Sequence, residues 1–155
     1  MFTHGSAWDV VHSGSPQTTA TYDAQMIEYA WRGAFDSAEV ELLHAECFDR
    51  EPGAWNWLGQ VERHSLGWVS ARDAGRLVGW VNVAWDGAGH AFLLDTSVTR
   101  SHRRRGVATQ LVAVGTDGAR DAGCEWMHVD FEPHLRALYL DACGFSSTDA
   151  GVIQL

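Results

Sequence analysis

One arginine-rich turn constrains this chain more than any other feature. The stretch DTSVTRSHRRRGVATQL, residues 95–111, leaves a β-rich run at 90–98 and enters a helical pattern that continues to about residue 122. Four of the chain's 11 cationic residues fall within this turn, namely Arg100, Arg103, Arg104 and Arg105. The fold must therefore concentrate positive charge where one strand passes into one helix.

Such a turn is typical of an anion site. A helix N-terminus exposes unpaired N–H groups and carries about half a positive charge. Gly106 lets a ligand approach the backbone closely, the neighbouring arginines present forked donors, and Thr109 adds a hydroxyl beside the small Ala108. The pattern predicts a pyrophosphate cradle, although a merely solvated basic corner is an open alternative. Neither Gly-x-x-x-x-Gly-Lys nor Gly-x-Gly-x-x-Gly occurs, which disfavours ATP hydrolysis and nicotinamide binding.

The hydrophobic patterns predict a mixed α/β fold around a central sheet. We expect strands at 26–33, 67–87 (a hairpin), 90–98, 125–132 and 151–155, and helices at 36–48, up to about 64, 106–122 and 133–143. Asp36 and Glu39 form an expected capping box. Alternation along 90–98 places Phe92, Leu94, Thr96 and Val98 on one face, and Leu93, Asp95 and Ser97 on the other. Residues 1–24 are expected to be a weakly ordered lead-in to one domain over 25–155.

Composition excludes several classes of protein. A net charge of −9 argues against a nucleic-acid partner. The three cysteines lack Cys-x-x-Cys spacing, which favours a reducing, cytoplasmic setting, and no His/Cys cluster predicts a metal. The N-terminus lacks the pattern of a signal peptide, and the longest apolar run, LVGWVNVAW, is too short to cross a bilayer, so no membrane partner is expected.

The segment VTRSHRRRGVA resembles the acetyl-CoA-binding signature of the GNAT superfamily of N-acetyltransferases. Its core, Arg/Gln-x-x-Gly-x-Gly/Ala, is met by Arg103, Gly106 and Ala108, and the valine five residues upstream is met by Val98. Arg100 stands where many members have proline. The likeness continues through WMHVDFE and HLRALYLDACGF, and the expected element order resembles that of GNAT proteins from about residue 26.

This resemblance implies a GNAT fold, with a mixed, mostly antiparallel sheet that splays between its fourth and fifth strands. Acetyl-CoA would lie in that cleft as cosubstrate, with no metal. Backbone groups near Ser97 and Val98 would bind the pantetheine arm. The pyrophosphate would be held by the segment Arg103, Arg104, Arg105, Gly106, Val107, Ala108 and Thr109. GNAT-like proteins are often dimers, so a homodimer is possible.

The implied reaction is acetyl transfer to a primary amine, most simply on a small molecule, by direct attack. An alkyl ammonium has a pKa near ~10, so the reaction gains from a general base. The base candidates are Asp95, Asp130 and Glu132, the last two at the side where the acceptor should approach. His128 shares a face with Asp130, but a lone histidine on a strand is more often structural. The oxyanion would accept a hydrogen bond from a backbone N–H near Val98.

The resemblance also assigns Tyr139 as the acid that protonates the CoA thiolate. In the family this tyrosine usually lies four residues before the glycine of Gly-Phe, whereas Tyr139 lies five before Gly144. One residue rotates a helix by about 100°, so the expected helix must contain a bulge or Tyr139 must point elsewhere. As a core aromatic, Tyr139 would have no catalytic role.

Trp55 and Trp57 follow the first expected helix, where the fold commonly shapes the acceptor pocket, and they could cover a cationic or aromatic acceptor. Ordinary core packing is the alternative for each. Two further readings stay open at this point. The acceptor could be a protein N-terminus or lysine, or the chain could be a GNAT-shaped module that binds CoA without turnover.

Overall fold

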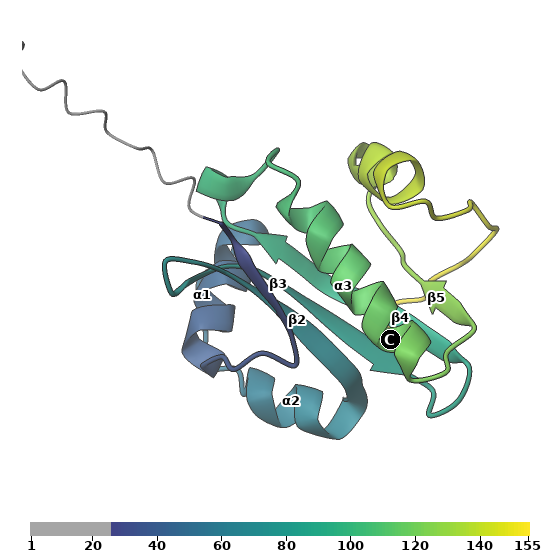
Figure 1. The fold of residues 1–155 in the computed structure, drawn as a ribbon, viewed down its shortest axis with the longest axis horizontal. Coiled ribbons are helices and arrows are strands. Elements are labelled where there is room, and N and C mark those ends of the chain that lie inside the picture. Colours follow the sequence, from purple (N-terminus) through teal and green to yellow (C-terminus); the bar gives the residue numbers. More distant parts are fainter. Residues whose placement is uncertain (1–25) are drawn as a thin grey trace, which may run out of the picture.

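The sheet at the centre of the computed structural model, which describes residues 26–155, has five strands in the order β1-β2-β3-β4-β5 (Figure 1). Strands β1 to β4 pair antiparallel, and β5 pairs parallel to β4. The elements are β1 (Glu28–Trp31), α1 (Ser37–Cys47), α2 (Trp57–His64), β2 (Ser65–Asp73), β3 (Arg76–Trp85), β4 (His90–Val98), η1 (Arg100–His102), α3 (Val107–Asp121), β5 (Trp126–His128), η2 (Pro133–Leu135) and η3 (Ala137–Ala142). The expected mixed, mostly antiparallel sheet is confirmed.

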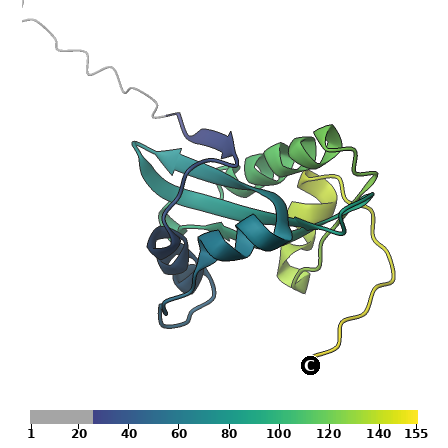
Figure 2. The same cartoon turned by 90° about the horizontal axis from the view of Figure 1, so that it is seen from below.

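Helices cover both faces of the sheet, and each face has its own core (Figure 2). On one face α1 and α2 pack through Val40, Leu43 and Val61 against Trp80 of β3. On the other face α3 packs through Leu111 and its neighbours against β2, β3 and β4. Within the described residues, no helix combines the length and the apolarity that crossing a membrane requires.

The start of α1 follows from its sequence. Asp36 accepts a hydrogen bond from the Ala38 N–H at 2.7 Å, and Glu39 accepts one from the Asp36 N–H at 3.2 Å. This confirms the expected capping box. The box fixes the direction in which α1 leaves β1, and α1 then carries the side chains that approach β4.

A β-bulge interrupts β4 and changes which way its residues face. Leu94 pairs with Asn82 and Ser97 with Trp80, so two residues of β4 lie opposite one residue of β3. Asp95, the first of the two, has a φ angle of 56°. Because of the extra residue, Leu93 and Val98 belong to the same core, although strict alternation would separate them. The expectation of unbroken alternation along 90–98 is therefore wrong.

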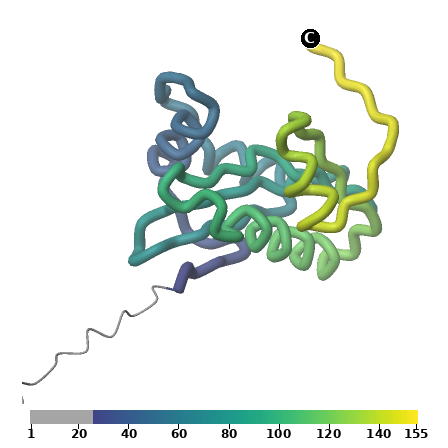
Figure 3. Tube along the Cα trace, turned by 90° about the horizontal axis from the view of Figure 1, so that it is seen from above, coloured from purple at the N-terminus to yellow at the C-terminus, as the bar shows by residue number. Residues whose placement is uncertain are grey.

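The C-terminal part differs most from expectation. Strand β5 has three residues where eight were expected, and the helix expected at 133–143 is a 3₁₀ turn followed by a π-helix. The strand expected at 151–155 is wrong, since residues 146–155 form neither helix nor strand. This segment runs past β5 and ends apart from the rest of the chain (Figure 3). The lead-in expected at 1–24 lies outside the described residues.

Candidate active site

The backbone at the start of α3 is open to an anion. Arg104 and Gly106 have positive φ angles of 59° and 78°, and α3 begins without a side-chain cap. The first hydrogen bond of the helix joins the Gln110 N–H to the Gly106 carbonyl at 3.0 Å, so the N–H groups of residues 107–109 find no main-chain acceptor between residues 26 and 155. A Cβ atom added at Gly106 would meet nothing within 4 Å.

The four arginines of this turn divide into two pairs. Arg100 forms an ion pair with Asp49 at 2.5 Å, and Arg103 donates through Nε to a main-chain carbonyl of β4 at 3.0 Å. Arg104 and Arg105 are exposed and form no ion pair with a carboxylate of the described chain. Two guanidinium groups thus hold the turn, and two are free to meet a diphosphate.

Two acidic side chains, one from α1 and one from β2, hold the arginine turn through hydrogen bonds. Glu46 of α1 accepts hydrogen bonds from the Arg100 N–H at 2.7 Å and the Thr99 hydroxyl at 3.1 Å. These hydrogen bonds hold the pKa of Glu46 below its usual value, and the bond from the Arg100 N–H has the largest effect. The Nε2 atom of buried His102 lies 2.8 Å from Oδ2 of Asp73. Sequence reasoning missed these contacts because 29 to 54 residues separate the partners.

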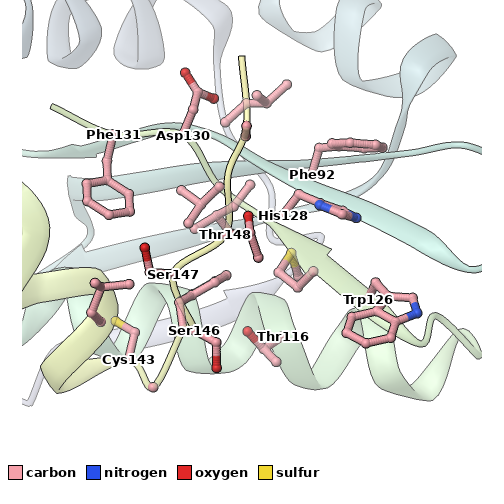
Figure 4. A pocket seen from close by; sticks show the side chains of 18 of the residues that line it. Phe92, Thr116, Trp126, His128, Asp130, Phe131, Cys143, Ser146, Ser147 and Thr148 are labelled. Atoms are coloured by element: carbon pink, nitrogen blue, oxygen red, sulfur yellow. The ribbon is translucent and has the colours of Figure 1, made fainter. Parts of the chain in front are cut away.

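A cavity of about 780 Å³ lies where β4 and β5 separate (Figure 4). The two strands pair over three residues, His90 to Phe92 with Trp126 to His128, and then diverge. The lining comes from both strands, α3, η3 and the C-terminal segment, and includes Leu94, Thr116, His128, Phe131, Cys143 and Ser147. The expected splay between the fourth and fifth strands therefore has a physical counterpart.

The predicted carboxylates take different positions around this region. Asp130 is exposed and belongs to the cavity lining, but its carboxylate points away from α3 (Figure 4). Glu132 is exposed and lies outside the lining. Asp95 lies at the β4 bulge, where its Oδ1 atom is 3.4 Å from Nε2 of His44 in α1. Sequence reasoning did not identify His44, which lies 51 positions before Asp95 and in no recognisable motif.

Tyr139 reaches the same bulge from the opposite face of the sheet. Its hydroxyl lies near the side chain of Thr96, and its ring stacks on Phe131 with centroids 5.0 Å apart. Burial, with 4% of the residue exposed, raises the pKa of Tyr139, and the nearby Thr96 side chain opposes this rise. The phenol therefore keeps its proton near neutral pH.

The unusual spacing between Tyr139 and Gly144 has a structural explanation. Residues 137–142 form a π-helix, in which the Cys143 N–H donates to the Leu138 carbonyl at 2.9 Å. The wider turn accommodates one extra residue, so Tyr139 keeps its direction toward β4 despite the five-residue gap. Of the two alternatives left by the sequence, a bulge in the helix is therefore the one observed.

Trp55, in the loop after α1, and Trp57, the first residue of α2, differ in their surroundings. Trp55 is 59% exposed, and its indole N–H donates to Gln60 at 2.6 Å. Trp57 is buried in the core, where its indole N–H donates to Glu41 at 2.8 Å. The Trp57 ring packs against the His44 ring, with centroids 4.9 Å apart. Trp57 therefore helps to hold His44 in place next to the bulge.

Ser97 and Val98 lie just after the bulge and are buried. The Ser97 hydroxyl donates to the Asp95 carbonyl at 3.1 Å, and the Val98 carbonyl accepts from Arg103. These bonds tie the bulge to the arginine turn. Among residues 26–155, no cluster of three or more His, Cys, Asp or Glu side chains could hold a metal ion.

Comparison with known proteins agrees with this geometry. The model of the acetyltransferase (GNAT) family matches residues 24–145, so the chain belongs to the GNAT acetyltransferase family. No curated protein matches the sequence. A probable acetyltransferase of unknown function from meticillin-resistant Staphylococcus aureus has a similar structure, with a TM-score of 0.69 and 16% identity over 84% of this chain and 98% of that one.

Two further structures have the same fold. Glucosamine-6-phosphate N-acetyltransferase from Arabidopsis thaliana superposes with a TM-score of 0.66 and 12% identity, over 83% of this chain and 98% of that one. AAC(6')-Iy, solved with the bisubstrate analog CoA-S-monomethyl-acetylneamine, gives a TM-score of 0.62 and 21% identity, over 84% and 97%. At these identities the likeness establishes the fold alone.

Proposed function

We propose that the protein transfers the acetyl group of acetyl-CoA to a primary amine of a small molecule. One observation carries this proposal. The β4 bulge places a carboxylate and a phenol at consecutive residues, Asp95 through its own side chain and Tyr139 through Thr96. The bulge lies one short loop upstream of an open helix start with two free arginines, Arg104 and Arg105. A proton acceptor, a proton donor and an anion cradle are what amine acetylation by a CoA thioester needs.

The residues present fit acetyl-CoA as the acetyl donor. The open N–H groups of residues 107–109, the free space over Gly106 and the unpaired Arg104 and Arg105 are suited to a diphosphate. The segment 93–98, which has no partner strand on its β5 side, would offer main-chain groups to the pantetheine arm. Bound there, acetyl-CoA supplies the acetyl group as a thioester.

The chain's own groups would then share the proton transfers. Asp95 first takes one proton from the ammonium, directly or through water. The neutral amine nitrogen then bonds to the thioester carbonyl carbon, the carbon–sulfur bond breaks, and the second proton of the nitrogen passes to water. Tyr139 gives its proton to the departing thiolate, a role that its raised pKa permits because the phenol stays protonated. A main-chain N–H beyond the bulge, near Val98, would donate to the carbonyl oxygen.

Three observations favour a small amine as acceptor. The chain carries a net charge of −9, which attracts cations in general. The loop 48–56 is held against α1 beside His44, since Phe48 stacks on His44 and Glu41 accepts from the Gly53 N–H at 2.5 Å. Two structures of similar fold are named for amino-sugar substrates, glucosamine-6-phosphate and an acetylneamine analog.

Calorimetric titration with acetyl-CoA tests the cradle. Gly106→Trp should fill the open space and raise the Kd at least about tenfold, which corresponds to about 1.4 kcal/mol. Gly87→Trp is the matched control, because Gly87 also has a positive φ angle (82°) and open space around it but lies in the β3–β4 turn. Equal affinities in the two variants would contradict the cradle.

Thiol release measured across amino sugars, polyamines and short peptides tests the reaction. Turnover of amino sugars or polyamines supports the proposal. Turnover of peptides alone would replace the small-molecule acceptor with a polypeptide. Tight acetyl-CoA binding without thiol release from any amine would instead identify a binding module and overturn the transferase assignment.

A further inference from the structure

A chain of four polar side chains leads from the inside of α1 to the β4 bulge, and no part of the comparison with known proteins assigns it. The chain is Glu41, Arg50, His44 and Asp95. Arg50 binds the Glu41 carboxylate with two bonds of 2.6 and 3.0 Å. His44 lies between Arg50 and Asp95, with one ring nitrogen facing each of them.

The proton on His44 can be placed from its partners. Arg50 approaches Nδ1 through Nη2 at 2.9 Å and through Nε at 3.3 Å. A guanidinium has only donors and does not lose its proton in proteins, so Nδ1 must be the acceptor. In the neutral ring the proton is then on Nε2, which faces Oδ1 of Asp95 at 3.4 Å. His44 therefore presents an N–H to Asp95.

Each member except Asp95 is held on several sides. The Glu41 side chain is 4% exposed and accepts further bonds from the Gly53 N–H and the Trp57 indole. The His44 ring stacks on Phe48 at 4.2 Å and packs on Trp57. The network thus has a rigid end inside the protein and delivers one fixed N–H to the bulge.

The bulge itself brings Asp95 to this N–H. Under strict alternation Asp95 would share the face of Leu93, which packs toward α3. The positive φ angle at Asp95 and the extra residue turn its side chain to the α1 face instead. Residues held in a left-handed conformation without glycine cost free energy, and such strain clusters at functional sites.

The charges in the network leave one negative charge without a partner. Glu41 and Arg50 neutralise each other. Burial lowers the pKa of His44, and the attraction of the Asp95 carboxylate opposes this effect only in part, so the pKa of His44 lies below its ordinary value. Neutral His44 contributes a dipole but no charge. Asp95 lies on β4, and 27% of its side chain is exposed. Within this network, no positive charge neutralises its carboxylate.

We infer that His44, fixed as the Nε2–H tautomer by Arg50 and Glu41, is a positioning residue that aims the Asp95 carboxylate at the protonated amine of the acceptor. This inference rests on the proposed function and specifies its acceptor as a cation that enters from the α1 side. The ammonium pairs with Asp95 and then passes its proton to that carboxylate before attack.

Long-range ¹⁵N–¹H NMR of the histidine rings, with His44 assigned through His44→Gln, tests the tautomer without any turnover. The expected spectrum at pH 7 is a neutral ring protonated on Nε2. A ring protonated on Nδ1, or a doubly protonated ring at pH 7, would overturn the inference whether or not the protein is an enzyme.

Kinetics with a polyamine or amino-sugar substrate then test the positioning role. His44→Phe keeps the stacked ring but removes the N–H, and should lower kcat/KM roughly 10- to 100-fold, as expected when a catalytic group loses its orientation. Acetyl-CoA affinity should not change. His44→Gln places an amide N–H close to the original Nε2 and should recover most of the loss. His64→Phe, at an exposed position in α2, is the control.

The pH profile separates positioning from simple structural support. A proton on Nδ1 would face the Arg50 guanidinium. The kcat/KM of the wild type should therefore fall as the pH drops through the pKa of His44, which lies below the ordinary histidine value of 6.5. Asp95, Arg50 and Glu41 are the charged groups that face His44, and none of them is changed in His44→Gln. This acid limb should be absent from that variant.

The outcomes distinguish the two proposals. Full activity in His44→Phe, or an acid limb unchanged in His44→Gln, overturns the positioning role but leaves the transferase intact. If the wild type binds acetyl-CoA and acetylates no amine, the proposed function fails, and the assignment of an ammonium to Asp95 fails with it. Thermal unfolding of each variant shows whether a loss of activity reflects a loss of folding.

Discussion

Asp95 and Thr96 are consecutive residues of β4, and their side chains face opposite layers of the protein. Asp95 meets His44 of α1, and Thr96 lies near Tyr139 of η3 on the other face of the sheet. Strand alternation alone separates the two side chains. The β-bulge decides which layer each one meets, because the extra residue shifts the alternation by one position. In the proposed reaction, a proton acceptor and a proton donor would thus approach β4 from the two faces of the sheet.

Removal of the Tyr139 hydroxyl tests the donor side of this arrangement. Tyr139→Phe keeps the stacking on Phe131 and should lower kcat roughly 100-fold, the usual contribution of a general acid, with little change in the Kd for acetyl-CoA. Because burial raises the pKa of Tyr139, wild-type activity should show no decline from phenol ionisation below pH 10. Stopped-flow or steady-state thiol release measures both effects.

The control for this prediction is Tyr29→Phe. Burial also raises the pKa of Tyr29, but this residue lies in β1, at the far edge of the sheet from the cleft. It should retain wild-type kcat. If Tyr139→Phe were equally active, the phenol would be a core aromatic and the thiolate would take its proton from water.

The unpaired arginines should account for the salt dependence of acetyl-CoA binding. Arg104→Gln and Arg105→Gln should each raise the Kd about tenfold, or about 1.4 kcal/mol, because each removes a charged donor from the diphosphate. The double variant should also lose most of the decrease in affinity that added salt causes in the wild type. Arg63→Gln, in the exposed last turn of α2, should behave as wild type. Calorimetric titration with acetyl-CoA at two ionic strengths measures these Kd values and their salt dependence.

Sequence patterns predicted the parts of this fold that depend on neighbouring residues. The strand 90–98 was expected at the residues where β4 is found, and the helix after Gly106 agrees with α3 within one residue at each end. Periodicity and the αL glycine are local signals, so they survive without knowledge of the tertiary structure. The glycine and arginines of the cradle were recognisable for the same reason.

The remaining features depend on contacts that no local pattern reports. The β4 bulge is invisible in a run that alternates, because a bulge is defined by the partner strand. His44 and Glu46 lie in a helix whose sequence carries no functional motif, and only the docking of α1 on β4 brings them to Asp95 and Thr99. The short apolar run at 151–155 resembles a strand, but strands need partners, and the described residues provide none for it.

Glu41 should make the protein sensitive to acid. Hydrogen bonds from Arg50, which has the larger effect, and from the Gly53 N–H lower the pKa of Glu41 from an ordinary 4.5 to about 2. A carboxyl with a depressed pKa in the folded state contributes stability that is complete above pH 4.5 and is lost as the pH falls toward 2. Glu41→Gln should therefore cost about 2 kcal/mol at pH 7, in the range for charged hydrogen bonds.

Urea denaturation at pH 7 and at pH 3 measures this effect. The difference in unfolding free energy between wild type and Glu41→Gln should shrink at the lower pH, where the unfolded carboxyl is protonated and part of the advantage is gone. Glu62→Gln serves as the control, because Glu62 is exposed on α2 and forms no ion pair within residues 26–155. A difference that stays constant with pH would contradict the assigned role of Glu41.

Glu46 should link α1 to the affinity for acetyl-CoA, although it does not reach the cradle. Its carboxylate accepts from the Thr99 hydroxyl and the Arg100 N–H, so Glu46→Ala frees the entrance of the turn. We expect faster amide hydrogen exchange across residues 99–106 and a Kd raised roughly 3- to 10-fold, since a loosened site must be ordered on binding. Exchange should be unchanged in Glu51→Ala, an exposed position in the next loop. Unaltered exchange in Glu46→Ala would mean that the other contacts hold the turn without Glu46, among them the 2.8 Å contact between His102 and Asp73 and the bond from Arg103 to the Val98 carbonyl.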